Sequence, residues 1–142
     1  MERKASARWT GDLREGKGTV RLGSGAFEGP FSFKTRFEDA PGTNPEELLG
    51  AAHAGCFTMA LSAQLAKGGH APRRVDTEAV VHLDMVGQGF VITRIDLVTR
   101  GDVPGLSEAE FKRLAEETKV NCIVSKALAS VPMTVQATLA AG

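Results

Sequence analysis

The stretch Thr43–Lys67, TNPEELLGAAHAGCFTMALSAQLAK, decides the fold, because it predicts one long helix with a polar start and an apolar body. Asn44 is a good N-cap, and Pro45 fits the first helical position, where its missing N–H would be unpaired anyway. Glu46 and Glu47 put negative charge at the positive end of the helix dipole. Glu47 also stands three residues after Asn44, as in a capping box.

The body of this helix is apolar or small on every face, and such a helix is expected to be buried on all sides. A membrane span is not expected, because no charged flanks accompany the run and polar residues or glycines interrupt it at Gly50, His53, Gly55, Ser62 and Gln64. We therefore predict a central core helix that holds Cys56 inside it.

Length and composition bound the class of protein. A chain of 142 residues predicts a single domain, 1–142, that buries about two thirds of its unfolded surface. A formal net charge of zero and 42% hydrophobic residues argue against disorder, nucleic-acid binding and attraction to anionic membranes. The start, MERKASARW, lacks the apolar segment of a secretory signal, so a cytoplasmic protein is expected.

The N-terminal part predicts an antiparallel meander of three strands. Ala5–Thr10 and Thr19–Leu22 alternate apolar and polar residues, and the glycines between them supply turns. Phe31–Glu38 alternates as well, with its aromatic residues on one face and Arg36 on the other. This third strand would end just before the long helix.

The part after the long helix predicts a second antiparallel meander and two further helices. Val75–Val86 and Phe90–Arg100 alternate around a glycine hairpin turn. Ser107 opens a helix to about Lys119, Asn121 looks like the N-cap of a short helix to about Leu128, and Met133–Leu139 is a final strand. The predicted class is α+β, with two antiparallel β-meanders around a long buried central helix.

One such sheet has difficulty covering the whole surface of an apolar helix. A second copy of the chain would complete the cover, so we expect a homodimer with the central helices at or near the shared core.

Cys56, Cys122 and Arg36 are the candidates for chemistry. A reactive Cys56 needs a nearby cation that stabilises its thiolate, and Arg36 could supply that charge. Cys122, in the first turn of the predicted short helix, would suit a thiol that attacks an oxidised Cys56. The alternatives are that both cysteines pack as small apolar residues and that Arg36 is a solvated strand residue.

His53 lies three residues before Cys56, on the same helical face. It could be a base or half of a metal site, but no further His, Cys or Asp stands at metal-ligand spacing. We therefore expect His53 to pack within the helix layer, facing the dimer partner, and we expect no metal site.

Longer motifs carry a family resemblance. The run from Thr43 to Phe57, preceded by Thr35-Arg36-Phe37-Glu38, closely resembles the OsmC branch of the OsmC/Ohr superfamily of bacterial thiol peroxidases. The likeness covers nearly the whole chain, including the segments Trp9–Asp12, Gly16–Thr19, Val103–Gly105 and Asn121–Ser125. The position of Arg36 favours OsmC over Ohr, where the arginine comes from nearer the N-terminus.

The resemblance implies an intertwined homodimer with active sites at the subunit interface and a role in oxidative and osmotic stress defence. It implies a peroxidase that reduces organic hydroperoxides to alcohol and water. Cys56 matches the peroxidatic cysteine, Cys122 the resolving cysteine with which it forms a disulfide, Arg36 the activating arginine, and Glu46 the carboxylate that holds that arginine. No flavin, haem or metal is implied, and the disulfide needs an external dithiol reductant, for example of the lipoyl type.

Two other functions remain open from the sequence. The same cysteines could serve a redox sensor or a protein that binds a small apolar ligand, or they could merely pack. Phe37, Phe57 and Met59 flank Arg36 and Cys56 and could line a substrate pocket, although core packing would explain at least one of them.

Overall fold

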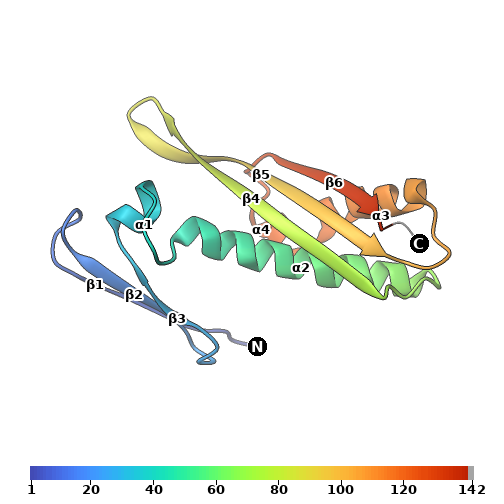
Figure 1. Ribbon diagram of the computed structural model, residues 1–142, viewed down its shortest axis with the longest axis horizontal. Coiled ribbons are helices and arrows are strands. Elements are labelled where there is room, and N and C mark those ends of the chain that lie inside the picture. The colour runs from blue at the N-terminus through green and yellow to red at the C-terminus, as the bar shows by residue number, and fades with distance from the viewer. Residues whose placement is uncertain (141–142) are drawn as a thin grey trace. The chain divides into compact units, whose positions relative to one another are not determined.

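The computed structural model describes residues 1–140, and the chain forms two compact units, Met1–Leu48 and Leu49–Gly142. The helices and strands confirm the predicted α+β class (Figure 1). Their order is β1 (Ala5–Thr10), β2 (Lys17–Leu22), β3 (Glu28–Phe31), α1 (Phe33–Phe37), α2 (Pro45–Lys67), β4 (Arg74–Val86), β5 (Gly89–Asp102), α3 (Glu108–Asn121), α4 (Ile123–Ala127) and β6 (Met133–Leu139).

The first unit contains the predicted antiparallel meander, in the order β1-β2-β3. Gly18 of β2 pairs with Trp9 on one side and with Phe31 on the other. The two rings meet over this glycine with their centroids 5.4 Å apart. A Cβ atom at Gly18 would lie 2.4 Å from the Phe31 ring, so the absence of a side chain there allows the aromatic contact.

The predicted strand Phe31–Glu38 is wrong beyond its first residue, because the chain turns into the short helix α1. Ser32 caps this helix: its hydroxyl oxygen accepts from the Thr35 N–H at 3.2 Å, and the Thr35 hydroxyl oxygen accepts from the Ser32 N–H at 2.8 Å. This reciprocal capping box outweighs the alternation of apolar residues. Phe33 and Phe37 contact each other one turn apart with tilted rings, and Arg36 lies on a helix rather than on a strand.

The second unit has a three-stranded sheet in the order β4-β5-β6 (Figure 1). β4 and β5 form the predicted hairpin, but β6 runs parallel to β5, so the prediction of a second fully antiparallel meander is wrong at its last strand. The helices α3 and α4 form the connection between β5 and β6. A crossover through helices brings the chain back to the same end of the sheet and therefore produces a parallel pair.

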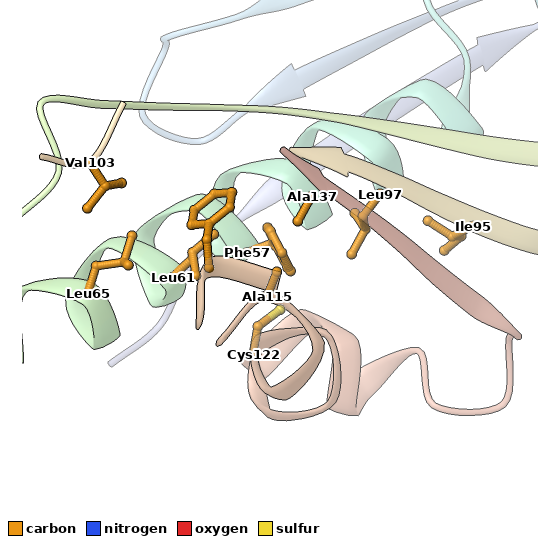
Figure 2. Close-up of a cluster of buried hydrophobic side chains, with 10 residues drawn as sticks. Phe57, Leu61, Leu65, Ile95, Leu97, Val103, Ala115, Cys122 and Ala137 are labelled. Carbon is orange, nitrogen blue, oxygen red and sulfur yellow. The ribbon is translucent and has the colours of Figure 1, made fainter. Parts of the chain in front are cut away.

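The core of this unit is one stripe of α2 packed against β5 and α3. Phe57, Leu61 and Leu65 recur every four residues along α2 and have at most 1% of their surface exposed. Figure 2 shows them together with Ile95, Leu97 and Ala137 of the sheet, Ala115 of α3 and Val103, which follows β5. Near the start of this stripe, a Cβ atom at Gly50 would lie 3.4 Å from the Ala79 carbonyl oxygen, so the glycine lets α2 approach β4 closely.

The prediction that α2 is buried on all sides is wrong for the single chain. Its buried residues form one face, whereas Ala51, Gly55 and Ala63 are exposed and Met59 is 76% exposed. The three-stranded sheet and the helices α3 and α4 cover only one side of α2. By length and composition α2 could also cross a membrane, a test that the core helices of soluble proteins pass too.

Adjacent residues of β5 provide a test of this core. Leu97 faces inward with no exposed surface, and its neighbour Val98 faces outward with 43% exposed. Leu97→Ala is expected to lower the free energy of unfolding by about 2–5 kcal/mol, because it removes buried methyl groups and leaves a cavity. Val98→Ala is expected to cost less than about 1 kcal/mol. Urea denaturation followed by circular dichroism measures both, and equal losses would contradict this orientation of the strand.

Candidate active site

The ion pair between Arg36 and Glu46 is the most polar feature of the first unit. Arg36 Nη2 lies 2.7 Å from Glu46 Oε1, and Arg36 Nε lies 3.1 Å from the same oxygen and 3.3 Å from Oε2. The Glu46 side chain is 9% exposed and that of Arg36 is 42% exposed. One edge of the guanidinium is therefore held by a buried carboxylate, and among residues 1–140 no hydrogen bond occupies Nη1. This free edge can meet an anion.

Asn44 fixes the geometry of this pair by binding to both helices. Its Oδ1 accepts from the Glu47 N–H at 2.7 Å, as predicted for an N-cap of α2. Its Nδ2 donates to the carbonyl oxygen of Thr35 in α1 at 3.1 Å. The side chain of Glu47 accepts from the Thr43 hydroxyl at 2.8 Å. Because one amide joins α1 to the first turn of α2, Arg36 and Glu46 are brought to the same place.

A pocket of about 210 Å³ opens beside Arg36 in the first unit. Its walls are mostly apolar: Trp9, Leu13, Phe31, Ser32, Phe33, Arg36, Phe37 and Pro45. The Arg36 guanidinium carbon lies 5.3 Å from the centre of the Phe37 ring, within cation–π range. The pocket thus combines an aromatic surface with one positive charge.

The three predicted pocket residues have different surroundings. Phe37 lines the pocket beside Arg36. Phe57 has no exposed surface and belongs to the core cluster, so the packing alternative holds for it. Met59 is 76% exposed on α2, and its place in a substrate pocket stays a prediction.

Both cysteines are free thiols in the second unit. Cys56, near the middle of α2, is partly buried against the core cluster. Cys122 is 2% exposed and belongs to that cluster (Figure 2). The predicted N-cap Asn121 is wrong, because α3 continues through Asn121 and Cys122 itself caps α4. Its Sγ accepts from the Ser125 N–H at 3.3 Å, which places the sulfur at a backbone donor.

His53 is fully buried inside the chain, so the expectation that it faces a dimer partner is wrong. Its Nε2 lies 2.8 Å from the hydroxyl oxygen of Ser125, and its Nδ1 has no partner among the described residues. Burial lowers the pKa of His53, so the ring is neutral at neutral pH. Sequence reasoning did not single out Ser125, since its contact with His53 joins positions 72 residues apart.

The predicted site residues therefore fall into two groups. Arg36 and Glu46 are joined in the first unit, and Cys56 and Cys122 both belong to the second. The assembly of the two groups into one site stays a prediction. Within residues 1–140, no three His, Cys, Asp or Glu side chains are grouped so that they could hold a metal ion.

Comparison with known proteins identifies the family. A family model described as OsmC-like protein matches residues 37–136. The chain belongs to the OsmC-like family. Peroxiredoxin OsmC of Escherichia coli (strain K12) is 47% identical over 129 residues, which are 90% of each protein. The organic hydroperoxide resistance protein of Xanthomonas axonopodis pv. citri (strain 306) is 34% identical over 87 residues, 61% of this chain and 59% of that protein.

A solved structure shares the fold. An OsmC-like protein from Vibrio cholerae O1 biovar eltor superposes with a TM-score of 0.76 at 17% identity, covering 96% of this chain and 99% of that one. The predicted family is thus confirmed, and the greater identity and coverage of the OsmC relative agree with placement in the OsmC branch of the OsmC-like family.

The two asparagines at helix ends provide a matched test of the capping assignments. Asn44→Ala is expected to lower the free energy of unfolding by about 1–2 kcal/mol, because it removes the cap of α2 and the bond to Thr35. Asn121→Ala is expected to change it by less than about 0.5 kcal/mol, because Asn121 is an exposed last residue of α3. Urea denaturation measures both, and a larger effect at Asn121 would contradict the assignment of Cys122 as the cap.

Proposed function

We propose that this OsmC-like protein is a thiol-dependent peroxidase that reduces organic hydroperoxides to alcohol and water, with Cys56 as the peroxidatic and Cys122 as the resolving cysteine. The names of its relatives support the activity, since one is a peroxiredoxin and another an organic hydroperoxide resistance protein. The assignment of roles rests on the free thiols of the two cysteines and on the hydrogen-bond partners of Cys122. Both are free, and Cys122 is linked through Ser125 to His53, one helical turn from Cys56 on α2.

The reaction divides into three steps. The Cys56 thiolate attacks the terminal peroxide oxygen, the O–O bond breaks, and the alkoxide leaves as alcohol after taking a proton. Cys56 becomes a sulfenic acid, and Cys122 condenses with it to form a disulfide and water. An external dithiol, for example of the lipoyl type, then returns the disulfide to two thiols. These steps need no metal, flavin or haem.

Arg36 and its pocket support an organic substrate. A guanidinium held on one edge by Glu46 can use its other edge to stabilise the thiolate and the developing alkoxide. The aromatic walls beside it suit the hydrocarbon part of an alkyl hydroperoxide. In this proposal Glu46 acts through Arg36, whose orientation it fixes.

The proposal includes a homodimer with sites shared between subunits. The exposed apolar face of α2, centred on Met59, supports a second copy as its cover. Glu46 and Cys56 are ten residues apart on a helix without a break, which corresponds to about 15 Å along a straight axis. In this proposal the arginine bound to Glu46 serves Cys56 of the other subunit. We place the protein in the cytoplasm, where thiol reductants are available, and in defence against oxidative and osmotic stress.

Cysteine variants test the reaction. Cys56→Ser is expected to have no activity towards an alkyl hydroperoxide in the presence of a dithiol, because the nucleophile is lost. Cys122→Ser is expected to consume about one equivalent of peroxide and then stall or over-oxidise, because no thiol captures the sulfenic acid. Multiple-turnover kinetics and non-reducing mass spectrometry follow both. A fully active Cys56→Ser protein would contradict the proposal, and a wild-type protein that stops after one equivalent would indicate a redox sensor.

Mixed dimers test the shared site. Arg36→Ala and Cys56→Ser are each expected to lower activity by at least about 10²-fold. When the two variants are unfolded and refolded together, a mixed dimer with shared sites contains one intact Arg36–Cys56 combination. About one quarter of wild-type activity should return, since half of the dimers are mixed and each has one working site. Light scattering confirms the dimer. No recovery in a mixture that forms dimers would place Arg36 and Cys56 in the same subunit.

A further inference from the structure

A chain of hydrogen bonds joins the thiol of Cys122 to the imidazole of His53. Cys122 Sγ lies 3.2 Å from Ser125 Oγ, and Ser125 Oγ lies 2.8 Å from His53 Nε2. All three side chains are at most 3% exposed. They come from α2 and from the start of α4, and the Cys122 end belongs to the apolar cluster shown in Figure 2. A polar chain at such a place is isolated from bulk water.

One arrangement of the hydrogens lets a proton move along this chain, and it holds for the tautomer of His53 that carries its proton on Nδ1. Cys122 donates its S–H to Ser125 Oγ, which leaves the hydroxyl hydrogen of Ser125 free to point at His53 Nε2. In that tautomer Nε2 accepts, and the ring proton is on Nδ1, which has no partner among the described residues. Neutral His53 thus presents a lone pair at the end of a path that starts at the thiol. Its lowered pKa, caused by burial, keeps that lone pair available at neutral pH.

We propose that His53, acting through Ser125, accepts the proton of Cys122 while this thiol attacks the sulfenic acid of Cys56. The proposal rests on the roles assigned to the two cysteines above and adds a base for the resolving step. His53 also lies three residues before Cys56 on α2. The proton acceptor and the oxidised sulfur therefore occupy neighbouring turns of one helix.

The step balances without another reagent. As the Cys122 sulfur forms the S–S bond, its proton passes to Ser125 Oγ and the hydroxyl proton of Ser125 passes to His53 Nε2. The S–O bond of the Cys56 sulfenic acid breaks, the Cys56 sulfur is reduced, and the Cys122 sulfur is oxidised. The departing hydroxide takes up one proton, which His53 gives back, and leaves as water.

The proton moves only during this attack. At equilibrium between a free thiol and a free imidazole, the proton favours the sulfur by a factor of about one hundred. The burial of His53 strengthens that preference, because it lowers the pKa of the imidazole. The path to His53 therefore carries a proton only when a sulfenic acid at Cys56 gives the Cys122 sulfur a bond to form.

Single-turnover kinetics with one equivalent of an alkyl hydroperoxide test the proposal. Sulfenic acid is followed by trapping with dimedone, and the disulfide by non-reducing mass spectrometry. His53→Gln can keep a hydrogen bond to Ser125 but cannot take a proton at neutral pH. It is expected to form the sulfenic acid within about twofold of the wild-type rate and to form the disulfide at least about tenfold more slowly. His70→Gln, in the turn after α2, is the matched control and should leave both rates unchanged.

Ser125 variants and the solvent isotope effect separate a proton path from a role in packing. Ser125→Ala should slow disulfide formation as His53→Gln does, and Ser125→Thr should restore it because the hydroxyl returns. Wild-type disulfide formation should be slower in heavy water, and this effect should disappear in both slow variants. Unfolding curves confirm that each variant is folded, and the Ser125 series decides the matter if His53→Gln does not fold.

These measurements distinguish a failure of the proton path from a failure of the proposed peroxidase function. Disulfide formation at the wild-type rate in folded His53→Gln or Ser125→Ala would overturn the proton path and leave the peroxidase assignment intact. A loss of sulfenic acid formation in these variants would also overturn the proton path, because His53 and Ser125 would then act on Cys56 rather than on Cys122. A wild-type protein that forms neither sulfenic acid nor disulfide would overturn the proposed function itself.

Discussion

The packing of one stripe of α2 against β5 and α3 is the constraint on which the second unit depends. Phe57, Leu61 and Leu65 place an apolar residue inward every four positions and meet Ile95 and Leu97 from the sheet. Full burial of each such side chain contributes about 1.5–3 kcal/mol. The same rotation of α2 also turns His53 inward, four residues before Phe57. The packing that stabilises the unit therefore also fixes where its buried imidazole points.

The polar groups of the protein are held in two different ways. Arg36, which is partly exposed, forms an ion pair with the buried Glu46, and the two helix caps Ser32 and Asn44 position this pair. His53, Ser125 and Cys122 form a buried chain that meets the apolar cluster at Cys122. Nδ1 of His53 has no partner among the described residues, which costs about 1–3 kcal/mol. The proposed role in proton transfer accounts for a buried imidazole at this place.

Strongly local patterns were predicted correctly from the sequence. The cap and apolar body of α2, the glycine hairpin between β4 and β5, and the start of α3 at Ser107 all depend on residues within a few positions. Two local patterns conflicted in the segment Phe31–Glu38. The capping box of Ser32 and Thr35 produces a helix there, although the alternation of apolar residues predicts a strand. The direction of β6 was missed because the alternation of a strand is the same for parallel and antiparallel pairing.

The sequence by itself determined the family and singled out the two cysteines and the pair of Arg36 and Glu46 as candidates, because each of them lies within a short motif. Only the tertiary structure decided that α2 buries a single face, that Cys122 rather than Asn121 caps α4, and that Ser125 joins Cys122 to His53. The contact of Ser125 with His53 joins positions 72 residues apart, and the cap at Cys122 depends on where α3 ends. Periodicity shows which residues share a face, but only packing determines what that face meets.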